Sequence, residues 1–425
     1  MSARHLPVRP NLEQLRHQAK DLLRQARRGD QAALAEITAQ LSETLEPGAI
    51  KLAQAQHALA RSYGVASWPR LVLACRLTDA IWEDDVDAIC QLVAKHPQLV
   101  HEMANGNERS NWGPPLSYAA NLGRDRVIRA LAERGATDLE HALDRASLQG
   151  KIDTARMLHR MMGEPRPRAG CLNGPAYTLN VPGIELMLEL GAQVHDEDGR
   201  LLAPVDVVLE TDSRTPVAKH QILEAFFRAG VELPDTPTMA LHRGRIDLLE
   251  EHLRRDPALL TRTFTHEEIY PPVLGCHDEV LATQGTPLAG TTLLHMCVDY
   301  DEQEIARWLI ARGMPVDAKA AVDADGFGGH TSLFGTVVSQ PNFWMNYQNR
   351  PQVPKLTQLL LDHGADPNVR ASLRKQLHTG YAREYDTSPH EYRAITPLAW
   401  GEQFHAKVFV SQPALQLIRE RGGHD

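Results

Sequence analysis

Apolar residues recur at helical spacing in the N-terminal part of the chain. Between Asn11 and Gly29 they form one stripe, and charged residues occupy the opposite face. Asn11 is a favoured N-cap residue, and Gly29 suits the left-handed conformation that ends many helices. The same kind of pattern predicts two further helices, over 30–45 and 50–63, and a fourth that begins after Ser67.

A Leu-rich helix that ends at a glycine recurs along the rest of the chain. The glycines that end these segments are Gly135, Gly191, Gly230, Gly313, Gly364 and Gly422. Ahead of several of them lies a helix-opening phrase, such as Thr292-Leu-Leu-His or Thr396-Pro-Leu-Ala. Threonine caps a helix through its hydroxyl and proline fits the first turn, so these phrases predict a series of helix pairs.

The helix-opening phrases resemble the Thr-Pro-Leu-His-x-Ala motif of ankyrin repeats. The resemblance implies an all-α ankyrin-repeat solenoid with an N-terminal helical cap and long loop insertions in its C-terminal half. We therefore predict a helical capping region over 1–78 and about nine repeat units, several of them degenerate, over 79–425. The phrase that begins at Tyr63, with the helix before it, is also similar to the N-terminal helical region of some bacterial ankyrin-repeat proteins.

The spacing of the terminal glycines indicates where extra chain interrupts the repeats. An uninterrupted ankyrin unit takes about 33 residues. The spacing lengthens after Gly230, which places insertions at 261–290, 318–330, 340–353 and 370–395. Aromatic residues make up only 5% of the chain, yet nine of them lie in these insertions. Tyrosine and tryptophan suit recognition, so we expect binding there; the alternative is that each insertion needs its own apolar staple to stay ordered.

Charge and cysteine usage narrow the classes of partner. Lys plus Arg number 45 and Asp plus Glu number 54, a net charge of −9, so we expect no nucleic-acid partner. The cluster of Lys20, Arg24, Arg27 and Arg28 fits the solvated face of a short helix. No uncharged apolar run approaches the roughly 18 residues of a membrane helix, so we expect no membrane partner. The five cysteines at irregular spacings predict reduced thiols and a cytoplasmic location.

Ligand-type residues gather in one insertion without a recognised order. They are His266, Glu267, Glu268, Cys276, His277 and Asp278, with no C-x-x-C or H-E-x-x-H motif, so we predict no metal site. Asp325 and His330 lie in a flexible stretch that lacks the later ligands of a calcium loop. Phosphate-binding glycine motifs and the G-x-S-x-G elbow do not occur in the sequence, so we predict no cofactor and assign no catalytic residue.

These patterns favour a protein-binding scaffold that recognises a macromolecular partner through its concave face and insertions. The alternative is a small-molecule binder or an unconventional enzyme whose pocket the insertions enclose. The candidate binding residues are Tyr270, His277, Asp325, His330, Trp344, Tyr347, Tyr381, Tyr385, His390 and Tyr392.

Overall fold

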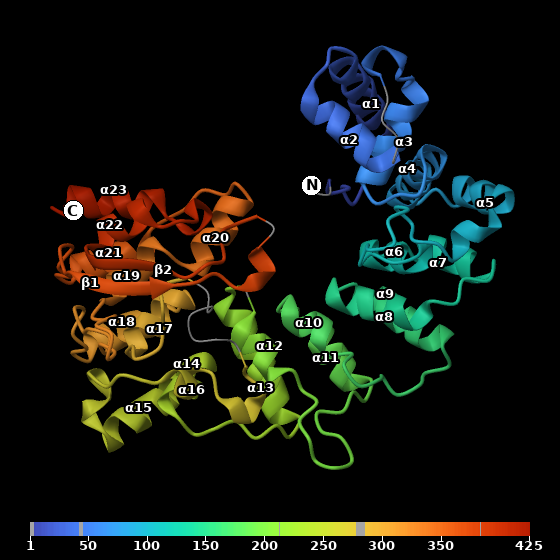
Figure 1. Cartoon of the computed structure of the whole chain (residues 1–425). Helices are drawn as coiled ribbons and strands as arrows, with labels where there is room; N and C mark the ends of the chain where they lie inside the picture. Colours follow the sequence, from blue (N-terminus) through green and yellow to red (C-terminus); the bar gives the residue numbers. More distant parts are fainter. Residues whose placement is uncertain (1–3, 42–45, 212, 278–284, 383) are drawn as a thin grey trace. The chain divides into compact units, whose positions relative to one another are not determined.

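The computed structural model describes residues 4–41, 46–211, 213–277, 285–382 and 384–425, and it is mostly helical (Figure 1). The chain divides into two compact units, Met1–Pro167 and Arg168–Asp425. No helix among the described residues is long and apolar enough to cross a lipid bilayer. The predicted helical fold class is therefore confirmed.

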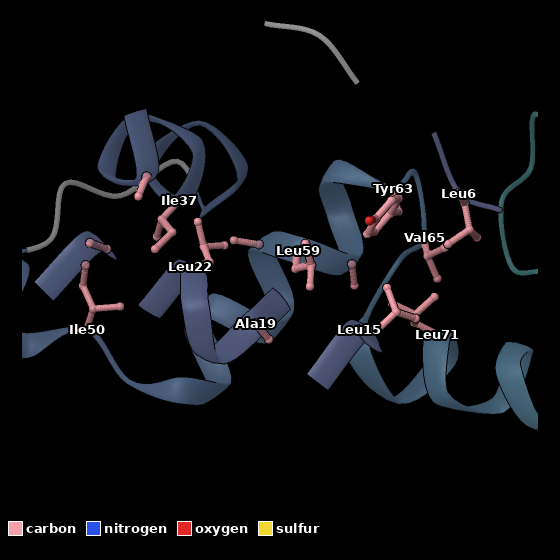
Figure 2. Close-up of a cluster of buried hydrophobic side chains, with 14 of the residues drawn as sticks. Leu6, Leu15, Ala19, Leu22, Ile37, Ile50, Leu59, Tyr63, Val65 and Leu71 are labelled. Carbon is pink, nitrogen blue, oxygen red and sulfur yellow. The ribbon is translucent and has the colours of Figure 1, made fainter. Parts of the chain in front are cut away.

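The N-terminal unit begins with a bundle of short helices. They are α1 (Leu12–Arg27), α2 (Gln31–Leu41), η1 (Pro47–Ala49), α3 (Leu52–Ser62) and α4 (Trp68–Trp82). Their apolar stripes meet in one buried cluster, in which Leu22 of α1 lies with Ile37 of α2 and Leu59 of α3 (Figure 2). Asn11 Oδ1 accepts the N–H of Gln14 at 2.9 Å, so the predicted N-cap is confirmed.

Helix pairs joined by short turns complete the N-terminal unit. The further helices are α5 (Val86–Lys95), η2 (Pro97–Val100), α6 (Pro115–Leu122), α7 (Asp125–Ala132), α8 (Leu139–Leu148) and α9 (Ile152–Met161). The first helix of each pair packs on the first helix of the next, α4 on α6 and α6 on α8, and α5 packs on α7. Helix α4 passes through residue 78, where we expected the cap to end, and the division at that residue stays a prediction.

The C-terminal unit is also built from helix pairs (Figure 1). Its pairs are α10 (Asn173–Tyr177) with α11 (Val181–Glu189), α12 (Val205–Glu210) with α13 (Pro216–Arg228), α14 (Pro237–His242) with α15 (Ile246–Arg255), α17 (Leu293–Asp299) with α18 (Gln303–Ala311), α19 (Ser332–Val337) with α21 (Lys355–Asp362), and α22 (Pro397–Gln403) with α23 (Gln412–Glu420). Among the first helices, α14 packs on α17, α17 on α19, and α19 on α22. In these contacts, one helix pair covers the apolar face of the next pair.

The glycines that end the second helices have the backbone conformation that the sequence predicts. All six of the glycines named above have φ between 86° and 100°, as in Gly364 and Gly230. A residue with a Cβ atom rarely adopts this left-handed region, and a glycine there ends the helix by turning the chain away. The repeated glycine phrase therefore has a direct structural cause.

Three of the four insertions contain helices or strands among the described residues. The 261–290 insertion contains α16 (His266–Ile269) and η4 (Pro272–Leu274), the 340–353 insertion contains α20 (Gln340–Tyr347), and the 370–395 insertion contains β1 (Ala371–Lys375), η5 (Thr379–Tyr381) and β2 (His390–Ile395). Two short helices lie outside the insertions: η3 (Pro257–Leu260) just before the first one, and η6 (Lys407–Phe409) between α22 and α23. We expected long loops, but 340–353 contains a helix and 370–395 forms an antiparallel hairpin. Alternate residues of β1 are buried, as in a strand with one face turned towards the interior.

Candidate functional site

An exposed group of aromatic rings forms where helix α20 meets the hairpin insertion. We call Phe343, Trp344, Tyr347, Tyr381 and Tyr385 the aromatic surface. Phe343 stacks on Tyr347 with 5.6 Å between ring centroids and meets the ring of Tyr381 edge-on at 5.5 Å. Tyr381 in turn lies 6.3 Å from Tyr385. Two insertions that are distant in the sequence therefore supply one continuous set of rings.

The degree of burial separates the anchor of this surface from its accessible part. Phe343 is buried and packs on Phe409, with 4.9 Å between centroids. Tyr347 is 61% exposed. Trp344, Tyr381 and Tyr385 are partly exposed. Phe343 thus anchors the aromatic surface on the protein interior, and the other rings are accessible to solvent.

Helix α20 is attached to the last helix pair by hydrogen bonds as well as by rings. The N–H of Ser339 donates to the carbonyl of Phe409 at 3.2 Å. The side-chain amide of Asn346 donates to the carbonyls of Val408 and Val410 at 2.7 and 2.9 Å. These contacts hold helix α20, which carries Trp344 and Tyr347, in place.

A second ring stack continues from β2. His390 lies parallel to His405 at 3.9 Å between centroids, and its Nε2 is 3.1 Å from Asp386 Oδ2. The hydroxyl of Tyr392 is 2.7 Å from His405 Nδ1. Burial lowers the pKa of His405 to about 4, and the adjacent His390 acts in the same direction.

A buried cluster of charged side chains joins the α12–α13 pair to the α17–α18 pair. Arg214 Nη2 lies 3.1 Å from Asp299 Oδ2, and both side chains are almost completely buried. The Arg214 guanidinium also lies 4.6 Å from the ring centre of Tyr300. Burial raises the pKa of Asp299, and the charge of Arg214 opposes that rise. The segment between α12 and α13 is thereby tied to the end of α17.

A second buried ion pair lies beside the first. Lys219 Nζ on α13 is 3.0 Å from Glu302 Oε1, and His220 Nε2 is 2.7 Å from the same oxygen. Burial lowers the pKa of Lys219, and the charge of Glu302 opposes the change. Burial would raise the pKa of Glu302, but Lys219 and His220 together hold it below its usual range. Both ion pairs connect the α12–α13 pair to the α17–α18 pair.

The insertions add polar groups to this buried cluster. Tyr270, from the 261–290 insertion, is buried with its hydroxyl 3.0 Å from that of Tyr300. Lys375, from β1, is also buried; burial lowers its pKa to about 7, against the opposing charge of Asp299. Tyr270, which the sequence analysis proposed as a binding residue, is therefore internal.

Three buried histidines fasten the insertions to the helix stack. His242 Nε2 donates to the carbonyl of Ile269 at 2.9 Å, and His330 Nε2 donates to that of Pro287 at 3.0 Å. His295 Nε2 donates to the carbonyl of His330 at 3.1 Å. Burial lowers the pKa of His295 to about 3 and that of His330 to about 4. The rings are therefore neutral donors at neutral pH.

A small cavity lies against this region. It has a volume of about 10 Å³ and is lined by Thr286, Pro287, Leu288, His295, Asp299, Ser332 and Gly335. Pockets for drug-sized ligands usually measure about 300–1,000 Å³. The cavity is too small for such a ligand.

One further group has the geometry of metal ligands. Asp206 and Glu210 of helix α12 and His277 of the 261–290 insertion each place a ligand atom within 4.8 Å of the others. We predicted no metal site because the ligand-type residues within the 261–290 insertion lack a recognised spacing. In that insertion, Glu268 forms an ion pair with Arg262 and accepts the N–H of Thr265. Asp278 lies outside the described residues.

The structure places the predicted site residues in several groups. Trp344, Tyr347, Tyr381 and Tyr385 belong to the aromatic surface, and His390 and Tyr392 to the adjoining ring stack. Tyr270 and His330 are internal. Asp325 is exposed, with its carboxylate 3.1 Å from Arg374 Nη2. Sequence reasoning missed Phe409, His405, Arg214, Asp299 and Lys375, since no local motif marks residues whose partners lie far away in the chain.

Comparison with known proteins gives little beyond the geometry. No family model matches the chain, and no curated protein matches it. Among solved structures, the chain is similar to the crystal structure of the human ASB11 ankyrin repeat domain. The similarity has 15% sequence identity and a TM-score of 0.28, and it covers 73% of this chain and 99% of that one. An overlap this loose carries no argument about partner or activity.

Proposed function

We propose that the chain is a protein-binding scaffold of the ankyrin-repeat type and that the aromatic surface is its main contact with the partner. The observation that carries the proposal is the exposure of Tyr347 on a buried ring anchor. If the aromatic residues served only to hold the insertions in place by apolar packing, this would explain Phe343, which packs on Phe409. It does not explain why Tyr347, with 61% of its surface in solvent, stands on the outer side of the cluster.

Aromatic side chains on a fixed support suit protein recognition for energetic reasons. Tyrosine and tryptophan bury a large area with few rotatable bonds, and they are enriched among residues whose truncation costs about 2 kcal/mol or more of binding free energy. The ring contacts within the aromatic surface already restrict these side chains before binding. Less conformational entropy is then lost on association.

The small-molecule and enzyme alternative has less support. The cavity beside Asp299 measures only about 10 Å³, and a larger one of about 280 Å³, lined in part by Thr236, His252 and Phe264, also lies below the usual volume of a ligand pocket. The ionic groups of Arg214, Lys219 and Glu302 are engaged with one another or with Asp299. These groups connect the α12–α13 pair to the α17–α18 pair. We therefore propose no catalytic residue.

Point substitutions test this proposal better than deletion of whole insertions. Deleting 261–290 or 370–395 removes buried residues such as Tyr270 and Lys375 and disturbs the fold. We expect the double variant Trp344→Ala, Tyr347→Ala to lose, in quantitative affinity enrichment from the source cell lysate, a protein that the wild type retains. The matched control is Phe227→Ala, which alters an aromatic residue of α13 that is 47% exposed. Equal enrichment by the double variant and the wild type would refute the assignment.

The proposed setting is the cytoplasm of a bacterial cell. None of the five cysteines forms a disulfide bond, and four of them are buried. This state supports a reducing compartment. The bacterial origin remains a prediction from the N-terminal sequence resemblance.

A further inference from the structure

We propose that Asp206, Glu210 and His277 bind a divalent transition-metal ion, which fastens the 261–290 insertion to helix α12. The proposal is independent of the protein-binding role. Asp206 and Glu210 lie one helical turn apart on α12, so their carboxylates lie on the same face. His277 joins them from a segment 67 residues away from Glu210. The three ligand atoms lie within 4.8 Å of one another.

The insertion is held close to helix α12 by specific contacts. The backbone N–H of His277 donates to Glu210 Oε1 at 2.8 Å, and His277 Nδ1 lies 3.5 Å from Glu210 Oε2. Gly275 has φ 91°, and a Cβ atom at this position would lie 3.4 Å from Asp206 Cγ. The chain therefore approaches the carboxylates with its backbone as well as with the imidazole.

The charge balance of the group favours a cation. Two carboxylates lie side by side, and Glu210 keeps only 8% of its side chain in solvent. The Asp206 carboxylate makes no hydrogen bond or ion pair within the described residues. The contact between His277 and Glu210 does not involve this second carboxylate. A divalent ion compensates both carboxylates and uses the imidazole as a third ligand.

The ligand set also indicates the class of ion. Carboxylate oxygens with one imidazole nitrogen suit ions such as Mn²⁺, Fe²⁺ and Zn²⁺, with bonds of about 2.0–2.2 Å. His277 is 76% exposed at its side chain, so water can complete the coordination on that side. His277 Nδ1 also lies 3.1 Å from the carbonyl of Gly275. The nitrogen that binds the ion must be unprotonated, as one of the two ring nitrogens is in the neutral imidazole.

Titration of the full chain with Mn²⁺, followed by calorimetry, tests the proposal. Mn²⁺ prefers oxygen and imidazole ligands to thiolates, which reduces interference from the cysteines. We expect one saturable site, weakened about tenfold or more by Asp206→Asn or by His277→Ala. His363→Ala, which changes the exposed histidine that directly follows α21, is the matched control and should bind as the wild type. Both test side chains are at least partly exposed, so the variants should stay folded.

Amide hydrogen exchange supplies a second readout. We expect Mn²⁺ to slow exchange in α12 and in residues 271–277 of the wild type, and to leave the exchange of His277→Ala unchanged. Absence of saturable binding at millimolar Mn²⁺ and Zn²⁺ would overturn the proposal. Wild-type affinity in both Asp206→Asn and His277→Ala would overturn it as well, because the ion would then bind elsewhere.

Discussion

Replacing His330 with glutamine should reduce the acid sensitivity of the C-terminal unit. His330 is buried, and its Nε2 links the 318–330 insertion to the carbonyl of Pro287 in the 261–290 insertion. Glutamine carries a donor and no basic nitrogen. The variant therefore keeps a way to bond Pro287 and removes the group that acid protonates.

The magnitude follows from the pKa difference between the folded and unfolded chain. Burial lowers the pKa of His330 from 6.5 to about 4. Below pH 6.5 the unfolded chain takes up a proton that the folded chain does not, so the free energy of unfolding falls as the pH falls from about 6.5 towards about 4. Each pH unit in that window costs about 1.36 kcal/mol, so the loss from His330 is about 2 kcal/mol at pH 5.

Urea unfolding at pH 7 and pH 5, read by pulsed hydrogen exchange in peptides of α17 and α19, measures this loss in the unit that contains His330. The wild type should lose about 2 kcal/mol more than His330→Gln between the two pH values, because the buried His242 and His295 remain in both proteins. The control His363→Gln changes an exposed histidine and should behave as the wild type. An equal pH dependence in wild type and His330→Gln would refute the reasoning.

Two further substitutions test other parts of the account. Arg214→Met leaves the carboxylate of Asp299 buried without its cation, so the free energy of unfolding should fall by about 3–5 kcal/mol in urea denaturation, and a fall below about 1 kcal/mol would contradict a buried ion pair. Gly328→Ala places a Cβ atom 1.9 Å from the carbonyl oxygen of Ala321, whereas Gly199→Ala, also at positive φ, meets nothing within 4 Å. Thermal unfolding should therefore show a clearly larger loss for Gly328→Ala, and equal losses would show that the turn relaxes freely.

Features that depend on neighbours in the sequence could be predicted. The cap at Asn11, the cap at Thr396 and the left-handed glycines at helix ends all depend on residues within one or two turns. Apolar periodicity likewise predicted α1 over Asn11–Gly29, and the structure has it over Leu12–Arg27. Local rules therefore account for most of the helical scaffold.

The internal organisation of the insertions could not be predicted in the same way. Arg214 and Asp299 are 85 residues apart, and Trp400 donates to Thr286 across 114 residues. The hairpin of 370–395 was missed because its strands are short, and its pairing contains an irregularity between Ala371 and Leu373. The count of aromatic residues pointed to the insertions, but only the fold separates exposed Tyr347 from buried Tyr270.

The central claim, that the aromatic surface contacts a protein partner, is tested most directly by site-specific photo-crosslinking. A photoreactive amino acid replaces Tyr347 in one protein and Phe227 in a control protein, both at exposed aromatic positions. Each protein is irradiated in the source cells, and crosslinked species are identified by mass spectrometry. The account predicts a defined crosslinked protein at position 347 that is absent at position 227 and is lost when Trp344→Ala is added. The same crosslinked species at both positions, or none at position 347, would contradict it.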